Sequence, residues 1–193
     1  MPALPLDLSA LFFGVNMTVF ISFATDRVVR AFGLEGLPLQ AFPAVMFIKG
    51  IAGLATLGTA AIKDRIGLPR LVRGLLVVSA LALIAVLPTS WPGVAAAAAL
   101  QGIFVMMMSA VLAFWSERLF PTPPSFSFTA TLSAVALGSV VGPALAGVLS
   151  EDLSPAAMFL SAAALSGAMA IAMRPRLIRE TPLDCREQPG PTH

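Results

Sequence analysis

The sequence predicts an all-α membrane protein with six transmembrane helices. Hydrophobic residues make up 58% of the 193-residue chain and charged residues only 11%, and the mean hydropathy is +0.90. A soluble domain is about half apolar and about a quarter charged, so this chain lacks the polar residues to cover a surface in water. Its apolar residues lie in six runs, most of them close to the roughly 20 residues that cross the hydrocarbon core. Their unbroken apolarity favours helices over barrel strands.

Pro, Gly or charged residues punctuate the chain between the runs. The first run lacks a basic region before it and a clear cleavage site after it, so we interpret it as a mature helix and not as a signal peptide. The membrane domain covers residues 1–174, and a polar cytoplasmic tail, 175–193, is expected to be disordered. The expected spans are 8–29, 39–62 (before the charged stretch 63–65), 71–87 (between Pro69 and Pro88), 94–115 (between Pro92 and Glu117), 128–149 and 156–173 (after Pro155).

The basic residues are distributed unequally between the two sides of the predicted bundle. With six spans, both termini lie on the same side as the loops after the second and fourth helices. That side carries Lys63, Arg65, Arg70, Arg73, Arg118, Arg174, Arg176, Arg179 and Arg186, and the opposite side only Arg27 and Arg30. The positive-inside rule therefore predicts that both termini are cytoplasmic.

Several function classes are disfavoured by what the sequence lacks. It has no Cys, His and carboxylate cluster with metal-ligand spacing, no glycine-rich phosphate loop and no nucleophile triad, so we expect no enzyme, no metal and no cofactor. No polar domain is present to carry a nucleic-acid interface. Trp91 and Trp115 fall near span ends and are expected to anchor the protein at the membrane interface, whereas residues 106–108, all Met, are expected to serve packing.

Lys49 is the clearest ionisable group at membrane depth. It lies about half-way along the second expected span, with Gly53 and Thr56 on the same helical face. Charged groups at this depth are costly and are functional candidates by default. One interpretation is a cation that lines a cavity and binds an anionic group or pairs with a proton-carrying carboxylate. The other is a lysine that extends to the interface or pairs structurally with a partner protein.

The charged stretch between the second and third spans is a recognisable motif. Residues 60–70, AAIKDRIGLPR, resemble the cytoplasmic loop motif G-x-L-x-D-R-x-G-R-R of the major facilitator superfamily. Asp64, Arg65 and Gly67 match this motif, and the sequence departs from it at Ala60, Leu68 and Pro69. Independently of the family, Gly67 permits a tight turn and Asp64 can face a helix N-terminus or an arginine. The alternative is a solvated turn that only helps to orient the helices.

Two further stretches fall where the resemblance places them. The fourth helix ends in SERLFP, residues 116–121, which looks like the acidic, basic and proline-containing exit of the family. The fifth contains the G-x-x-x-G-P pattern at Gly138, Gly142 and Pro143, followed by Gly147. Small residues four apart let two helices approach closely, and Pro143 can bend the helix. We therefore assign these four residues to helix packing.

The resemblance covers nearly the whole chain but only half of the usual transporter, which has two six-helix halves. It implies half of a twelve-helix bundle, most similar to the C-terminal half and to bacterial-type branches with short loops. The implied function is secondary transport of a small solute by alternating access in the bacterial inner (plasma) membrane, with a separate half or a second copy as partner. The alternative is a non-transporting membrane subunit or truncated remnant that packs against another membrane protein.

The resemblance also points to individual residues. The first and fourth helices of each half line the central cavity in the superfamily, so Asn16 and Gln101 are implied to bind substrate together with Lys49. Interhelical hydrogen bonding is the alternative for Asn16 and Gln101. Glu117 and Arg118 are expected to join Asp64 and Arg65 in an inner charge network that favours one access state. The contribution of such a network depends on shielding from water.

Overall fold

A computed structural model describes residues 4–24, 41–88, 90–119, 124–152 and 154–173 of the chain. The regular elements of these residues are all helical, and six of the helices are long and apolar enough to cross a membrane. The predicted fold class, an all-α protein with six membrane-spanning helices, is confirmed. The predicted tail, residues 175–193, lies outside the described residues.

The six spans differ in how regular they are. The first consists of α1 (Leu4–Val19) and a π-helical turn, η1 (Phe20–Ala24). The second is a succession of α3 (Ala41–Gly53), the 3-10 segment η2 (Leu54–Gly58) and α4 (Thr59–Ile66). The other four are the single helices α5 (Leu68–Ala85), α6 (Trp91–Leu119), α7 (Pro124–Asp152) and α8 (Pro155–Ala172).

The turn between the second and third spans is shorter than the sequence suggested. Helix α4 continues through the charged residues to Ile66, and α5 begins at Leu68, so Gly67 alone makes the turn. Its φ of 80° is a conformation that favours glycine. The Gly67 N–H donates to the Lys63 carbonyl at 2.8 Å, and the Gly67 carbonyl accepts from the Leu71 N–H at 3.1 Å. Pro69 is accommodated because the first helical turn has no intrahelical use for its missing N–H.

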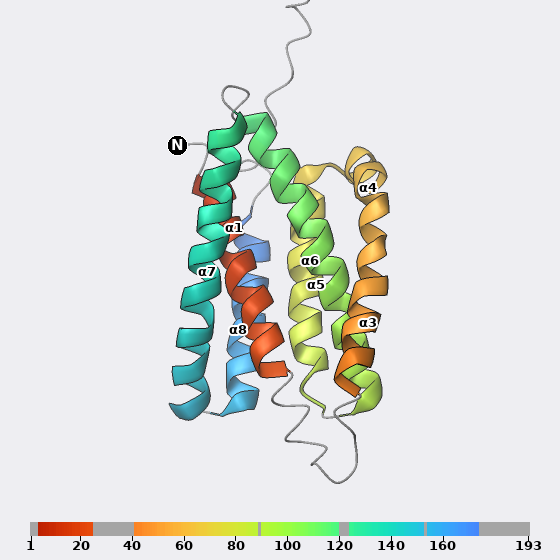
Figure 1. Cartoon of the computed structure of the whole chain (residues 1–193), viewed down its shortest axis with the longest axis vertical. Helices are drawn as coiled ribbons and strands as arrows, with labels where there is room; N and C mark the ends of the chain where they lie inside the picture. The colour runs from red at the N-terminus through yellow and green to blue at the C-terminus, as the bar shows by residue number, and fades with distance from the viewer. Residues whose placement is uncertain (1–3, 25–40, 89, 120–123, 153, 174–193) are drawn as a thin grey trace, which may run out of the picture.

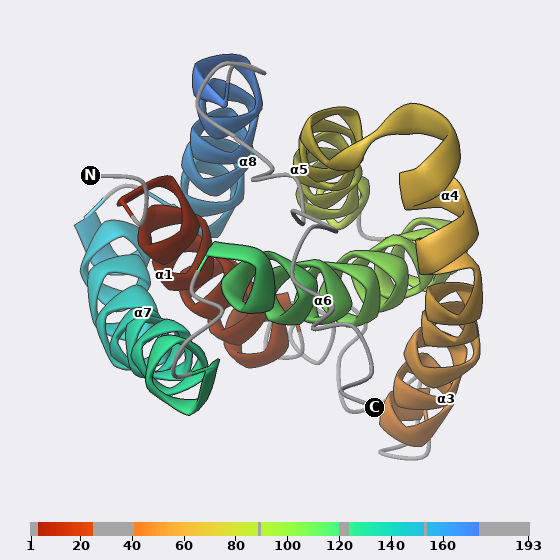
Figure 2. The ribbon, with the colours of Figure 1, turned by 90° about the horizontal axis from the view of Figure 1, so that it is seen from above.

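The helices form two layers. In Figure 1, α7, α1, α6 and α3 form a front layer, with α8 and α5 behind it, and Figure 2 shows the same arrangement from above. Helix α1 packs most extensively on α7, and α6 packs on α3 and on α5, which also packs on α8. If the six spans are divided into the first three and the last three, the first span of each group packs on the second span of the other group: α1 on α7, and α6 on α3.

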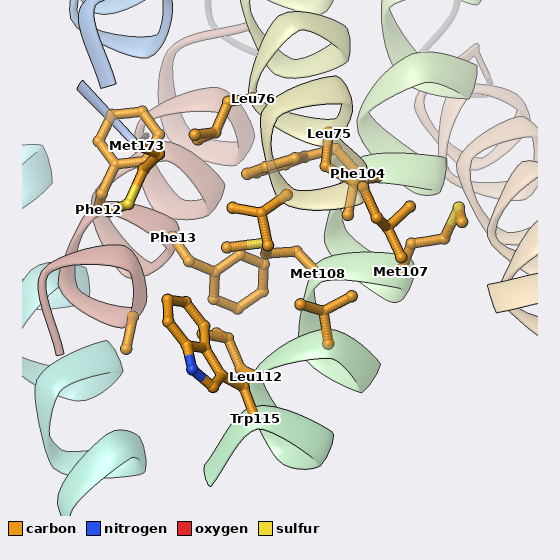
Figure 3. Packing of buried hydrophobic residues seen from close by; sticks show 14 of the residues in the cluster. Phe12, Phe13, Leu75, Leu76, Phe104, Met107, Met108, Leu112, Trp115 and Met173 are labelled. Atoms are coloured by element: carbon orange, nitrogen blue, oxygen red, sulfur yellow. The ribbon is translucent and has the colours of Figure 1, made fainter. Parts of the chain in front are cut away.

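The core lies between these layers. One cluster joins α1, α5 and α6 to the end of α8, with Phe13 and Phe104 in contact at 5.8 Å between ring centroids (Figure 3). The prediction that Trp115 anchors the protein at the membrane interface is wrong. Its side chain is 1% exposed and belongs to this buried cluster. Helix α6 extends to Leu119, so Trp115 lies a turn inside the helix end. The side chain of Trp91 lies outside the described residues.

The two end helices of the front layer are the least covered. In the apolar 18-residue stretch of each span, only 11% of the residues are buried in Val45–Ile66 and 17% in Phe128–Ser150, whereas 56% are buried in Pro92–Glu117. Large apolar side chains are exposed on both spans, such as Leu57 in η2 at 87% and Val140 in α7 at 73%. Helices α1 and α6 therefore form the centre of the bundle, and α3 and α7 flank them.

Candidate functional site

Polar side chains of three helices meet inside the bundle. The Gln101 side-chain nitrogen Nε2 in α6 donates to Asn16 Oδ1 in α1 at 3.1 Å, and Asn16 Nδ2 donates to Ser166 Oγ in α8 at 3.3 Å. The Ser166 hydroxyl donates to the Ala162 carbonyl at 2.9 Å. This chain of hydrogen bonds links the front layer to α8. It is the geometry that the interhelical alternative for Asn16 and Gln101 requires.

Substrate contact by the same two amides stays a prediction. Asn16 is 3% exposed and Gln101 0%, so a solute reaches them only if the surrounding helices separate. Within the described part of the chain, Gln101 Oε1 has no hydrogen-bond donor. Ser166 also belongs to this cluster. The sequence did not indicate it, because the two serines of the alanine-rich helix α8, Ser161 and Ser166, give no signal that tells them apart.

Lys49 lies where α3 contacts α6. Its carbonyl oxygen meets the place where a Cβ of Gly102 would stand, so the absent side chain of Gly102 allows the two backbones to touch. Gly102 is about 16 Å along α6 from its first residue at 1.5 Å per residue, which is about half of the 30 Å hydrocarbon thickness. If the hydrocarbon begins near the start of α6, Lys49 lies near the middle of the membrane, as the sequence predicts.

The Lys49 side chain is half-buried and reaches α1. Its ammonium nitrogen Nζ lies 5.9 Å from the centroid of the Phe20 ring, within the range of a cation–π interaction. Figure 2 shows that α1 and α3 lie on opposite sides of α6, so the contact spans the central helix. Among the described residues, no carboxylate forms an ion pair with Lys49.

Phe20 begins an irregular turn. Residues Phe20–Ala24 are π-helical, a rare conformation that is frequent at functional sites. Two residues earlier, the Thr18 hydroxyl donates to the Gly14 carbonyl at 2.7 Å and lies 3.2 Å from the Val15 carbonyl oxygen. Back-bonding of this type bends helices. The Phe20 ring is 3% exposed and packs with the buried residues at this end of the bundle. Lys49 is thus held against a fixed ring.

Among the described side chains, no ion pair of the predicted inner charge network joins Asp64 or Arg65 to Glu117. The ion pair found at this place is formed by Lys63. Its ammonium lies 3.4 Å from Asp64 Oδ1 and 5.4 Å from the centroid of the Phe114 ring of α6. Arg65 and Glu117 are exposed, and the side chain of Arg118 lies outside the described residues. The structure therefore brings the end of α4 to α6 through Lys63 and Phe114, which the sequence analysis did not select for this role.

Arg73 forms a contact that the sequence did not indicate. Its Nε donates to the Ala170 carbonyl at 3.1 Å, near the C-terminal end of α8. A cation is favourable at a helix C-terminus, where carbonyl groups lack intrahelical partners. This hydrogen bond connects α5 with α8 on the side where α4 ends.

Small residues allow the closest helix contacts. A Cβ on Gly138 would meet the Leu11 carbonyl oxygen, and one on Gly142 would lie 2.8 Å from Val15 Cα, so both glycines bring α7 against α1. A Cβ on Gly147 would have no atom within 4 Å, so this glycine makes no close helix contact of the same kind. Pro143 lies inside α7 and is partly exposed.

The chain was compared with known proteins. The family model described as Major Facilitator Superfamily matches residues 6–189. No curated protein and no solved structure matches the chain. The match covers all six membrane-spanning helices and both of the motifs in the second and fifth spans.

Proposed function

This chain belongs to the major facilitator superfamily, and we propose that it is one six-helix half of a secondary transporter that moves a small solute by alternating access. The family indicates a transporter-type function. The observation that carries the proposal is the match over residues 6–189 onto a bundle of six spanning helices with α1 and α6 at its centre. In a two-half transporter, the solute is held near the midplane between the halves.

A second half completes the path in this proposal. Helices α3 and α7, at the two ends of the front layer, have the least buried spans of the chain, and their exposed apolar faces are available for helix contacts. The occupant that we propose is a second copy in parallel orientation, since the two halves of the superfamily are related by an axis along the membrane normal. The distribution of basic residues supports cytoplasmic termini in both copies.

Lys49 is the residue proposed to contact the solute, because its ammonium is the charged group described near the membrane midplane. Asn16, Gln101 and Ser166 are proposed to hold α1, α6 and α8 together as one rigid unit, with solute contact by Asn16 and Gln101 limited to states in which the helices open. Asp64, Arg65 and Glu117 are proposed to contact the partner half at the cytoplasmic side when the inner gate closes.

The assembly is tested by native mass spectrometry of the chain in mild detergent. A homodimer, or a complex with a different six-helix protein, restores twelve helices and supports the transporter. A monomer in membranes as well as in detergent, established by crosslinking before extraction, overturns the two-copy assembly and favours the packing subunit.

Solvent access to Lys49 tests alternating access directly. Cys185 is the only cysteine of the chain, so Cys185→Ser provides a background for Lys49→Cys. We expect a membrane-impermeant maleimide to label this thiol in vesicles. Ser90→Cys, at an exposed position before α6, is the labelled control, and Val140→Cys, at a 73% exposed apolar position, is the unlabelled lipid-facing control. Complete protection of Lys49→Cys from both sides of the membrane contradicts alternating access at this residue.

A further inference from the structure

The Lys49 side chain has an unusual set of partners for a cation in a membrane-spanning helix. Within the described chain its contact is the Phe20 ring, and no acceptor for its three N–H donors is present there. A π face attracts an ammonium but does not neutralise its charge. A charge at this depth is expensive unless it is paired.

The acidic side chains that the structure describes do not supply that pair; the side chains of Glu151 and Asp152, at the end of α7, lie outside the described ones. Asp7 lies in the first turn of α1, Asp64 near the end of α4 beside Lys63, and Glu117 near the end of α6. Because α1 starts where α4 and α6 end, all three lie at one end of the bundle (Figure 1). Lys49 lies 15 residues before Asp64, or roughly 22 Å of helix away from that end.

The ring and the backbone around Lys49 are closely packed. The Phe20 ring is buried and belongs to the π-helical turn, and the backbone of Lys49 is pressed against Gly102. The side chain is still only half-buried, so part of it is accessible. Next to it, Gly50 is exposed, and no atom lies within 4 Å of the place of its Cβ.

These observations describe one positive charge with free donors and open space beside it. On the basis of the transporter proposed above, we propose that the Lys49 ammonium, supported by Phe20, is the binding point for a small monoanion such as a monocarboxylate, which the protein carries as its solute. A single charge favours a monoanion over a phosphate dianion, because phosphate sites typically combine several cationic or backbone donors. The other basic side chains that the structure describes, Lys63, Arg65, Arg70 and Arg73, lie at the end of the bundle where α4 meets α5.

The test uses the two lysines of the chain, Lys49 and Lys63. The full-length protein in mild detergent is treated with formaldehyde and a borane reductant, and methylation of each lysine is quantified by peptide mass spectrometry. The probes are chloride, thiocyanate, acetate and benzoate, with benzamide as the neutral analogue of benzoate and sulfate as a dianion. We expect at least one monoanion to slow the methylation of Lys49 at least fivefold in a saturable manner and to leave Lys63 unchanged, with no effect of benzamide.

A second measurement guards against indirect protection. The protecting anion is expected to raise the midpoint of thermal unfolding of the wild-type protein, because a ligand that binds only the folded state stabilises it. The increase is expected to be lost in Lys49→Met, which keeps the length of the side chain, and to persist in Lys63→Met. Equal protection of both lysines, protection by benzamide equal to that by benzoate, or no protection by any monoanion overturns the proposal.

The outcome is separable from that of the transporter proposal. If a monoanion protects Lys49 but the assembly moves no solute in proteoliposomes, the anion site stands and the transport function is wrong. If anions do not protect Lys49 while Lys49→Cys shows alternating access from the two sides, the transport function stands and the anionic substrate class is wrong.

Discussion

The contact of α3 with α6 depends on Gly102, and we expect Gly102→Ala to be among the most disruptive small substitutions in the chain. A Cβ at this position would meet the Lys49 carbonyl oxygen, 2.9 Å from its carbon and 3.1 Å from Lys49 Cα. Backbone atoms cannot rotate away as a side chain can, so the two helices must separate locally. Overpacking of this kind costs about 1–3 kcal/mol.

Gly50→Ala is the matched control, one residue from Lys49 on the same helix. No atom lies within 4 Å of its Cβ position, so the added methyl group meets open space. Alanine also has a higher helix propensity than glycine, by up to about 1 kcal/mol. Both variants gain this term, so they should differ by about the overpacking cost of 1–3 kcal/mol in the free energy of unfolding, or roughly fivefold to 150-fold in the unfolding constant.

The assay is equilibrium unfolding in mixed micelles with increasing sodium dodecyl sulfate, followed by tryptophan fluorescence in a Trp91→Phe background, which leaves the buried Trp115 as the reporter. Gly102→Ala should unfold at a lower fraction of the denaturing detergent than the wild type, and Gly50→Ala at the same or a higher fraction. Because α3 is the least buried span, part of the clash is relieved by movement of α3, which would also increase the labelling of Lys49→Cys. Equal stability of the two alanine variants would refute the close contact of α3 with α6.

The remaining predictions use the same unfolding assay. Asn16→Leu should lower the free energy of unfolding by about 1–2 kcal/mol and Gln101→Leu by about 0.6 kcal/mol or less, since Asn16 makes two interhelical hydrogen bonds and Gln101 one. A larger loss in Gln101→Leu than in Asn16→Leu contradicts this hydrogen-bond network. Gly67→Ala should cost about 1–3 kcal/mol because of its positive φ, and a neutral result rejects that turn. Arg73→Met should cost about 0.5–1 kcal/mol because its hydrogen bond to α8 is partly exposed, with Arg73→Lys intermediate. Lys49→Val should be as stable as the wild type or more so, because removal of a charge from the membrane offsets the lost cation–π contact; a loss above about 2 kcal/mol would make Lys49 a structural residue.

The number and type of the membrane spans could be predicted because both depend on composition and length alone. The ends of the helices could not, and the charged stretch after the second span shows why. Charge and the expected turn at 63–70 suggested an early end at residue 62, whereas α4 continues to Ile66. A helix that leaves the hydrocarbon can continue in water as long as its backbone hydrogen bonds persist, and here the chain turns only where Gly67 permits a positive φ.

The polar residues of the candidate site could be selected from sequence, but their partners could not. Asn16 and Gln101 stand out in apolar helices, yet they are 85 residues apart and contact each other only because α1 crosses α6. Trp115 was misplaced for a related reason. A tryptophan near a predicted span end is typical of the interface, but the extension of α6 and the packing of α1 on it bury this ring.

Helices α1 and α6 each contact a neighbouring helix through a glycine, and a comparison of the two contacts shows which residues packing requires. Gly14 of α1 meets the Val135 carbonyl of α7 in the same way as Gly102 of α6 meets the Lys49 carbonyl of α3. If α1 is aligned with α6 so that Gly14 matches Gly102, Phe13 matches Gln101 and Asn16 matches Phe104.

The two contacts between α1 and α6 obey this correspondence. Exchange of the two helices converts the hydrogen bond of Asn16 with Gln101 into the ring contact of Phe104 with Phe13. Such an exchange is the property of inverted three-helix repeats. Lys49 therefore occupies in α3 the place that Val135 occupies in α7. Because the same backbone contact forms around a valine, packing does not require a lysine there, which supports the proposal that the charge at this position serves binding.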